Sequence, residues 1–226
     1  MARTICCLLL AAVCLVVAPA WATTQGYPGT NLNDIPVAEV IPWRSFEIST
    51  WVTTGEREEP DWWGAVNVGI LDYGELGLYG MLGPSDEDRG DIRFHGKFVY
   101  PLGEGLPNLG AGLQNLTDDE DDNGAIDPFL VVTHDFGPVR GHAGYSFQDD
   151  DQAFFAGVDT SFDFLEQPAT VGLDLLQTDD GDEWLLSLGF EYELPLNFVV
   201  ESWYTWTTVD GNENMITVRL NWVTTF

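Results

Sequence analysis

The final stretch of the chain, MITVRLNWVTTF from Met215 to Phe226, decides the fold. Its apolar and polar side chains alternate, so that one face carries Ile216, Val218, Leu220, Trp222, Thr224 and Phe226 and the other Thr217, Arg219, Asn221, Val223 and Thr225. A period of two residues predicts a β-strand with one apolar and one polar face.

The same alternation recurs through most of the 226-residue chain. We expect twelve strands, at about 44–54, 63–71, 74–82, 91–100, 107–116, 126–135, 138–148, 152–162, 168–177, 183–192, 196–207 and 215–226. Ten strands are the alternative, because the runs at 74–82 and 107–116 are rich in glycine and only weakly patterned.

The connections between these strands fall into two classes that alternate along the chain. One class is short and carries few charges. The other holds most of the acidic residues, in the segments 55–62, 83–91, 117–125, 149–151, 178–182 and 209–214. In an up-and-down meander, alternate connections lie at opposite ends of the strands, so one rim is predicted to be strongly negative.

Composition limits the possible partners. The chain has 37 Asp and Glu against 8 Lys and Arg, a formal net charge of −29, with 45% hydrophobic and 13% aromatic residues. Nucleic acid is excluded as a partner, because phosphate binding requires clustered basic residues. The apolar and aromatic content also excludes a disordered acidic chain.

The first 22 residues have the features of a secretory signal peptide: Arg3, an apolar run from Ile5 to Pro19, and a small-x-small site that ends at Ala22. All three cysteines, Cys6, Cys7 and Cys14, lie in this segment, so the exported chain is expected to contain no thiol. Residues 23–43 contain Pro28, Pro36 and Pro42 and are interpreted as a periplasmic lead-in or a partial plug before a domain at 44–226.

An even strand number, short turns at one rim and longer loops at the other are typical of an all-β, up-and-down antiparallel transmembrane β-barrel. Strands of about 9–11 residues are long enough to cross a bilayer at a tilt. Two aromatic belts are expected on the lipid-facing side, one of Trp63, Tyr145, Phe147, Trp184 and Trp206 and one of Tyr100, Phe162, Tyr192, Phe198 and Phe226. A soluble secreted β-sandwich with these rings in its core is the alternative.

The exported chain, its meander and the alternating last strand that ends in Phe226 resemble bacterial outer-membrane β-barrel proteins over residues 44–226. The resemblance is to an architecture rather than to a functional family. It implies that Phe226 is part of the signal read by the barrel-assembly machinery, and that the mature chain lies in the outer-membrane lipid of a Gram-negative-type bacterium.

Charged side chains on the polar faces are predicted to line the lumen. They are Glu47, Glu75, Arg93, His95, Lys97, Arg140, His142, Asp159, Asp174, Glu191, Glu201 and Arg219. Charges of both signs have two interpretations: a selectivity zone in a narrow aqueous pore, or interior ion pairs that fill the lumen.

One acidic loop resembles part of a calcium loop. Asp119, Asp121, Asn123 and Asp127 occupy alternate positions, with Gly124 where a sharp turn is needed. Leu130 stands where the last, bidentate Glu is expected. No cofactor is expected other than this possible Ca²⁺.

No catalytic motif is visible, since the chain has no HExxH or GxSxG sequence. The sequence therefore favours a small passive channel for ions or solutes, with acidic external loops that attract cations. Two alternatives are a non-conducting surface barrel whose loops bind Ca²⁺ or a partner, and an outer-membrane lipid-modifying hydrolase.

Overall fold

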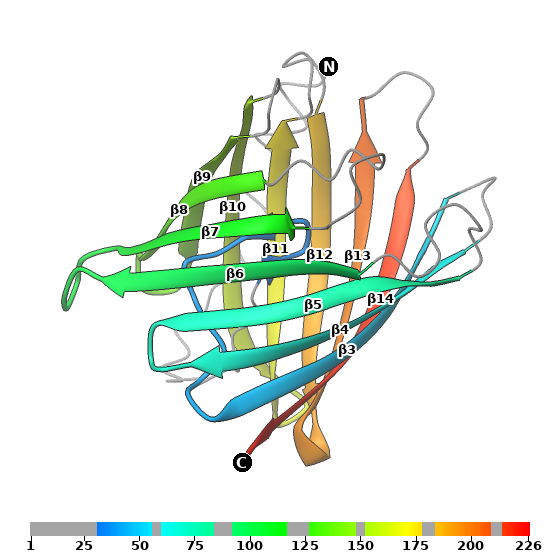
Figure 1. Ribbon diagram of the computed structural model, residues 1–226, viewed down its shortest axis with the longest axis horizontal. Coiled ribbons are helices and arrows are strands. Elements are labelled where there is room, and N and C mark those ends of the chain that lie inside the picture. Colours follow the sequence, from blue (N-terminus) through cyan, green and yellow to red (C-terminus); the bar gives the residue numbers. More distant parts are fainter. Residues whose placement is uncertain are drawn as a thin grey trace.

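The computed structural model describes residues 31–55, 60–83, 92–116, 127–147, 152–177, 184–208 and 214–226. Within these ranges, twelve antiparallel strands form a closed barrel in which each strand pairs with its neighbours in chain order (Figure 1). β14 pairs back on β3 and closes the ring. The prediction of an up-and-down barrel is confirmed, and a sandwich of two separate sheets is wrong for this chain.

The strand number is twelve rather than ten, and each strand begins and ends within two residues of its predicted bounds. The barrel strands are β3 (Ser45–Thr54), β4 (Asp61–Ile70), β5 (Gly74–Gly83), β6 (Ile92–Pro101), β7 (Asn108–Leu116), β8 (Asp127–Asp135), β9 (Arg140–Phe147), β10 (Gln152–Phe164), β11 (Gln167–Gln177), β12 (Trp184–Leu194), β13 (Phe198–Thr207) and β14 (Met215–Thr225). Two short strands, β1 (Asn31–Leu32) and β2 (Ile35–Pro36), form a separate hairpin.

Tight turns connect the strands at one rim. Between β10 and β11, Leu165 and Glu166 have φ of 51° and 68°, and positive φ at both central residues is what a type I′ hairpin turn requires. The β12–β13 turn contains a 3₁₀ turn, Pro195–Asn197. No helix among the described residues is long and apolar enough to cross a membrane.

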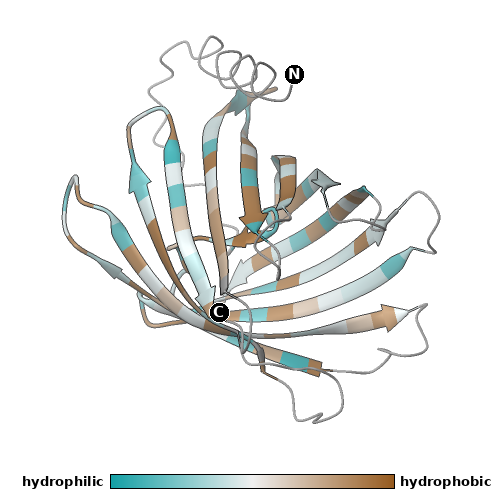
Figure 2. Cartoon of the chain, turned by 90° about the horizontal axis from the view of Figure 1, so that it is seen from above, coloured by the Kyte–Doolittle hydropathy of each residue, from teal (hydrophilic) through white to brown (hydrophobic). Residues whose placement is uncertain are grey.

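The outer face of the barrel is apolar and the inner face is largely polar. Phe98, Leu130 and Ile48 point outward and are 63%, 53% and 45% exposed. Asp174 and Ser187 point inward and are almost fully buried. Hydrophobic and hydrophilic residues accordingly alternate along the strands in Figure 2. An apolar exterior suits a barrel surrounded by lipid and is the reverse of the soluble rule.

The segment before the barrel lies inside it. Residues 31–43, drawn in blue, pass between the front and back walls in Figure 1. Ile35 and Ala38 are fully buried and pack in an apolar cluster with Val131 and Phe155 of the wall. Arg44, at φ 62°, and a hydrogen bond from Ser45 N–H to the Pro42 carbonyl (3.0 Å) turn the chain into β3.

Glycines in the wall make room for this segment. A Cβ on Gly157 would lie 2.8 Å from Leu32 Cδ2 and 2.9 Å from Ile35 Cδ1, closer than side chains tolerate. A Cβ on Gly69 would collide with the backbone carbonyls of Ile41 and Pro42. The wall and the segment are therefore complementary in shape.

One expectation about the faces was wrong. Trp63 points into the barrel, where it stacks against the inward-facing Trp51 at 6.0 Å between ring centroids, while its neighbour Trp62 faces outward and is 51% exposed. The interior also contains large apolar side chains, including Phe129 and Phe155, because the lumenal segment supplies an apolar surface for them to cover.

Candidate functional site: the lumen and the segment inside it

All twelve charged side chains predicted to line the lumen are on the inward side of their strands. Seven of them are at most 7% exposed: Glu47, Glu75, Lys97, His142, Asp159, Asp174 and Glu201. Of the remaining five, His95 and Arg219 line an interior cavity, Arg140 pairs with the lumenal segment, Arg93 lies over the inward Trp63, and Glu191 sits opposite Glu201 in the β12–β13 register.

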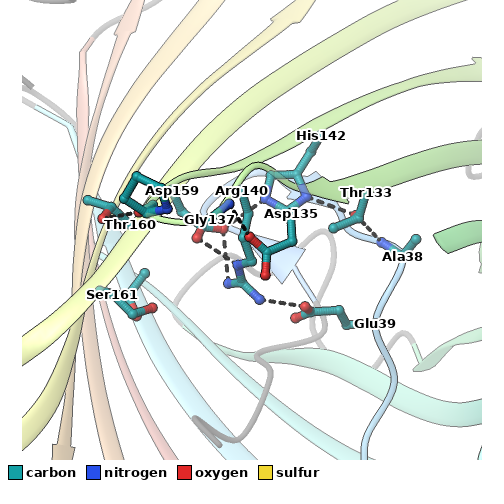
Figure 3. Close-up of polar contacts among 12 residues, drawn as sticks. Ala38, Glu39, Thr133, Asp135, Gly137, Arg140, His142, Asp159, Thr160 and Ser161 are labelled. Atoms are coloured by element: carbon teal, nitrogen blue, oxygen red, sulfur yellow. Dashed lines mark hydrogen bonds and ion pairs between the residues drawn. The ribbon is translucent and has the colours of Figure 1, made fainter. Parts of the chain in front are cut away.

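The first cluster holds the middle of the lumenal segment (Figure 3). Arg140 donates from Nε and Nη2 to the two carboxylate oxygens of Asp159, at 2.8 and 3.0 Å, and its Nη1 pairs with Glu39. Such a two-pronged Arg–carboxylate contact fixes the guanidinium plane. Arg140 thus ties the wall to residue 39 of the segment.

A chain of hydrogen bonds continues from the same Asp159. His142 lies 2.8 Å from Asp159 through Nε2 and 2.9 Å from the Thr133 hydroxyl through Nδ1. The Thr133 oxygen accepts from Ala38 N–H at 2.9 Å. In the arrangement that satisfies every group, Thr133 donates to Nδ1, and His142 carries its proton on Nε2 and donates to Asp159.

Hydroxyl, imidazole and carboxylate stand here in the order used by hydrolytic triads. Thr133 and His142 are each only 4% exposed, and the hydroxyl oxygen already accepts a backbone hydrogen bond. A nucleophile needs an approach path for its substrate, which this covered hydroxyl lacks. The hydrogen bonds among Thr133, His142 and Asp159 therefore hold the lumenal segment at Ala38.

A second cluster holds the segment on both sides of Glu39, at Val37 and Ile41. Lys97 Nζ donates to the Val37 carbonyl at 2.9 Å and lies 3.5 Å from Glu75. Glu75 in turn accepts from Ile41 N–H at 3.1 Å. This buried pair gains the additional hydrogen bonds that such pairs need to offset desolvation.

A third cluster holds the tip of the β1–β2 hairpin. Asp34 accepts hydrogen bonds from Trp203 Nε1 and the Thr205 hydroxyl, each at 2.9 Å, and from the Ser187 hydroxyl. Its backbone N–H donates to Asp174 at 3.3 Å. Three clusters on different parts of the barrel wall therefore hold residues 34–41 in place.

A fourth set of contacts joins side chains of β3, β4, β13 and β14 to one another. Glu47 accepts from Ser49 at 2.8 Å and from Asn67 at 2.9 Å. Arg219 lies 3.4 Å from Glu201, and its guanidinium carbon is 5.1 Å from the Trp51 ring and 5.0 Å from the Trp203 ring. A guanidinium between two indole faces is stabilised by cation–π attraction on both sides.

A cavity of about 370 Å³ remains between the lumenal segment and this wall. It is lined by β3–β8, β13 and β14, and by residues 31, 33 and 34 of the segment. The bore is therefore divided between an occupied part and an open part.

Several residues of this site were missed at the sequence level. Asp34 and Glu39 lie in the segment interpreted as a lead-in or partial plug, and their charges were the available signal. Trp51 and Trp203 share the parity of Glu47 and Glu201, which places them inside. They were overlooked because aromatic residues were assigned to the lipid interface.

The predicted calcium loop lies almost entirely outside the described residues. Asp119, Asp121 and Asn123 lie outside the described residues, and Asp127 is described only as the first residue of β8. Within the ranges that the structure covers, no three His, Cys, Asp or Glu side chains gather as a metal site.

No protein-family model matches the chain, and no curated protein matches it in sequence. Its structure is similar to a KdgM porin solved in complex with disordered oligogalacturonate, at 11% identity and a TM-score of 0.61, over 79% of this chain and 98% of that one. It is also similar to an outer-membrane channel from Pseudomonas putida F1, at 11% identity and a TM-score of 0.51, over 87% and 100%. The chain thus has the fold of bacterial outer-membrane channel barrels.

Proposed function

We propose that the protein is a passive channel of the bacterial outer membrane whose bore is narrowed by its own residues 31–43. The observation that carries this proposal is the division of the lumen: residues 34–41 are held by three clusters of wall side chains, while a cavity of about 370 Å³ stays open beside them. The apolar outer face supports a location in lipid.

The conducted species are small ions or solutes with a preference for cations. The six acidic segments predicted at the loop rim supply a negative field that concentrates cations at the mouth and repels anions. This selectivity depends on salt, because exposed charges are screened within about 10 Å at 0.1 M ionic strength.

We assign export to residues 1–22 and recognition by the assembly machinery to Phe226. Cleavage after Ala22 releases the mature chain into the periplasm. The ring of Phe226 is 72% exposed on the outer face, where the assembly machinery can reach it. No catalysis and no resident cofactor enter this proposal.

The competing function is a non-conducting barrel that acts through its loops. It is favoured by one observation, the burial of Ile35 and Ala38 in the bore, since a segment packed this closely can block passage. In that case residues 119–127 are the candidate Ca²⁺ site, and the channel is closed.

Planar-bilayer recording on the refolded mature chain separates the two functions. A channel gives discrete current steps, and reversal potentials in a KCl gradient show cation preference. Insertion without steps, together with saturable Ca²⁺ binding that is lost in an Asp119→Ala, Asp121→Ala variant, establishes the loop function instead.

A further inference from the structure

Every short connection of the barrel carries a large apolar side chain that is exposed. The five connections are residues 71–73, 102–107, 136–139, 165–166 and 195–197. Their exposed apolar residues are Leu71, Tyr73, Leu102, Leu106, Phe136, Leu165 and Leu196. Isolated exposed apolar residues are common on proteins, whereas a set that recurs in every turn at one end of a barrel forms an apolar rim, and such surfaces mark contacts.

Three leucines of this apolar rim stand where the backbone disfavours them. Leu71, Leu165 and Leu196 have φ of 55°, 51° and 68°, in the left-handed region that glycine and asparagine adopt most readily. They are also 58%, 75% and 81% exposed, so the rest of the chain covers little of them. Unfavourable backbone positions of this kind are retained where function requires them. An apolar contact outside the chain accounts for leucine at these positions.

The apolar rim is continuous with the lipid-facing surface of the barrel. Phe164 directly precedes Leu165, and its ring centroid lies 6.0 Å from that of Tyr192, a member of the aromatic belt that includes Phe226. Leu196 is followed after two residues by Phe198 of the same belt. The side chains at the turns therefore extend the surface that lipid already covers.

The depth of the apolar rim follows from its spacing to this belt. Leu196 lies four residues after Tyr192 and two before Phe198, and Leu165 lies three after Phe162. At about 3.3 Å per residue and a tilt of about 45°, two to four residues span about 5–9 Å along the membrane normal. The headgroup layer is about 5–7 Å thick on each side of the hydrocarbon. The leucines thus reach the headgroups.

Carboxylates accompany the leucines. Asp72, Glu104 and Glu166 each lie within two residues of a leucine of the apolar rim, and all three are exposed. No Lys or Arg occurs in the five connections. This charge repels anionic headgroups and attracts cationic ones. A primary ammonium also donates charge-assisted hydrogen bonds to a carboxylate, which a quaternary ammonium has no proton to do.

We propose that the apolar rim is a lipid-binding surface for phospholipids whose headgroup ends in a primary ammonium, such as phosphatidylethanolamine. The leucines insert between the headgroups, and the neighbouring carboxylates bind the ammonium groups. A protein partner is the alternative occupant, and continuity with the outer face favours lipid. This inference rests on the location in lipid that is part of the proposed function, and it does not depend on conduction.

The test attaches a nitrobenzoxadiazole fluorophore to Leu196→Cys in the mature chain, which is expected to contain no other cysteine. The protein is refolded in vesicles of phosphatidylethanolamine and phosphatidylcholine. We expect quenching by phospholipids brominated near the top of the acyl chains, and little quenching by iodide present on both sides of the membrane. Strong iodide quenching without lipid quenching overturns the proposal and leaves the apolar rim exposed to a protein partner.

Two further positions separate this inference from the membrane location itself. Leu130→Cys, on the outer face at the middle of β8, reports whether the barrel lies in lipid. Asn212→Cys, in an acidic external segment, is the reference for water. Lipid quenching at Leu130 but not at Leu196 keeps the barrel in the membrane and overturns the rim site alone. Absence of lipid quenching at both positions contradicts the membrane location, and this inference with it.

Native mass spectrometry after refolding in equal amounts of phosphatidylethanolamine, phosphatidylcholine and phosphatidylglycerol tests the headgroup class. We expect phosphatidylethanolamine to be retained about twofold over phosphatidylcholine, the size of effect that an exposed charge pair produces, and phosphatidylglycerol least. The triple variant Asp72→Asn, Glu104→Gln, Glu166→Gln should lose this preference. Neutralising the three acids of the external segment 178–182 is the matched control and should keep it. Equal retention of phosphatidylethanolamine and phosphatidylcholine by the wild type overturns the ammonium ligand.

Discussion

Arg140 on the barrel wall is paired with Glu39, which precedes the barrel in the chain by six residues and lies inside it. The same guanidinium holds Asp159 of the neighbouring strand. One side chain therefore joins two strands of the wall to the segment in the bore.

Glu39→Gln should loosen the segment without breaking the wall, since Arg140 keeps its two bonds to Asp159. Because both partners are partly exposed, the loss is expected to be about 1 kcal/mol. Single-channel recording should show larger or noisier steps than in wild type. Glu104→Gln, in the exposed β6–β7 turn, is the matched control. Identical current traces for all three proteins would mean that this pair does not control the bore.

Asp34→Ala should release the hairpin tip, because it leaves Trp203, Thr205 and Ser187 without their common acceptor. Hydrogen bonds to a charged acceptor contribute about 1.5–3 kcal/mol each. The mature chain is expected to contain no cysteine, so Ile35→Cys can be labelled selectively. Maleimide labelling of this fully buried position should be slow alone and faster when combined with Asp34→Ala. Equal labelling rates in the two backgrounds would show that Asp34 does not hold the hairpin.

Gly69→Ala should disturb the point where the chain leaves the bore. The new methyl group meets the backbone carbonyls of Ile41 and Pro42, which cannot move aside as a side chain can. Overpacking of this kind costs about 1–3 kcal/mol. Urea-dependent unfolding in detergent should shift to lower concentration, whereas Gly64→Ala, which meets only the flexible end of Leu82, should shift less. A larger loss in the Gly64 variant would argue against the close approach.

Neutralising the acidic loop segments by Asp→Asn and Glu→Gln changes should reduce cation preference while the step size stays similar, because the rim field and the bore are separate features. Reversal potentials in a tenfold KCl gradient measure this directly. The effect should shrink in 1 M salt, where screening acts within about 3 Å. Unchanged selectivity at low salt would remove the loops from the selectivity mechanism.

Phe226→Ala should reduce assembly in cells more than refolding in detergent. The Phe226 backbone N–H donates to the Arg44 carbonyl at 2.9 Å and is retained in the variant, whereas the exposed ring is lost. Heat-modifiable migration on gels reports folded barrel in both settings. An equal loss in the two settings would indicate that the ring stabilises the barrel and is not a recognition signal.

The barrel could be predicted because its strands repeat one simple rule. In Met215–Phe226 the alternation alone places Arg219 and Asn221 inside and Leu220 outside, and the structure agrees. Leu165 and Glu166 are not glycines, so the sequence does not indicate their positive φ. The positive φ follows from the tight connection between the paired strands.

The lumenal contacts could not be predicted in the same way. Asp34 and Trp203 are 169 residues apart, and only barrel closure brings them together. Trp63 was assigned to the wrong face because the same aromatic residue types occur at the lipid interface and in the lumen. Only the odd or even position along the strand separates the two. The interior apolar cluster depends on a segment whose path no local pattern indicates.

The most direct test of a channel narrowed by its own segment is planar-bilayer conductance of the mature chain compared with a chain that lacks residues 23–42, both shown to be folded by heat-modifiable migration. We expect small, discrete steps from the mature chain and clearly larger steps from the shortened one. Equal steps would contradict the role of the segment, and silence from both folded proteins would contradict the channel.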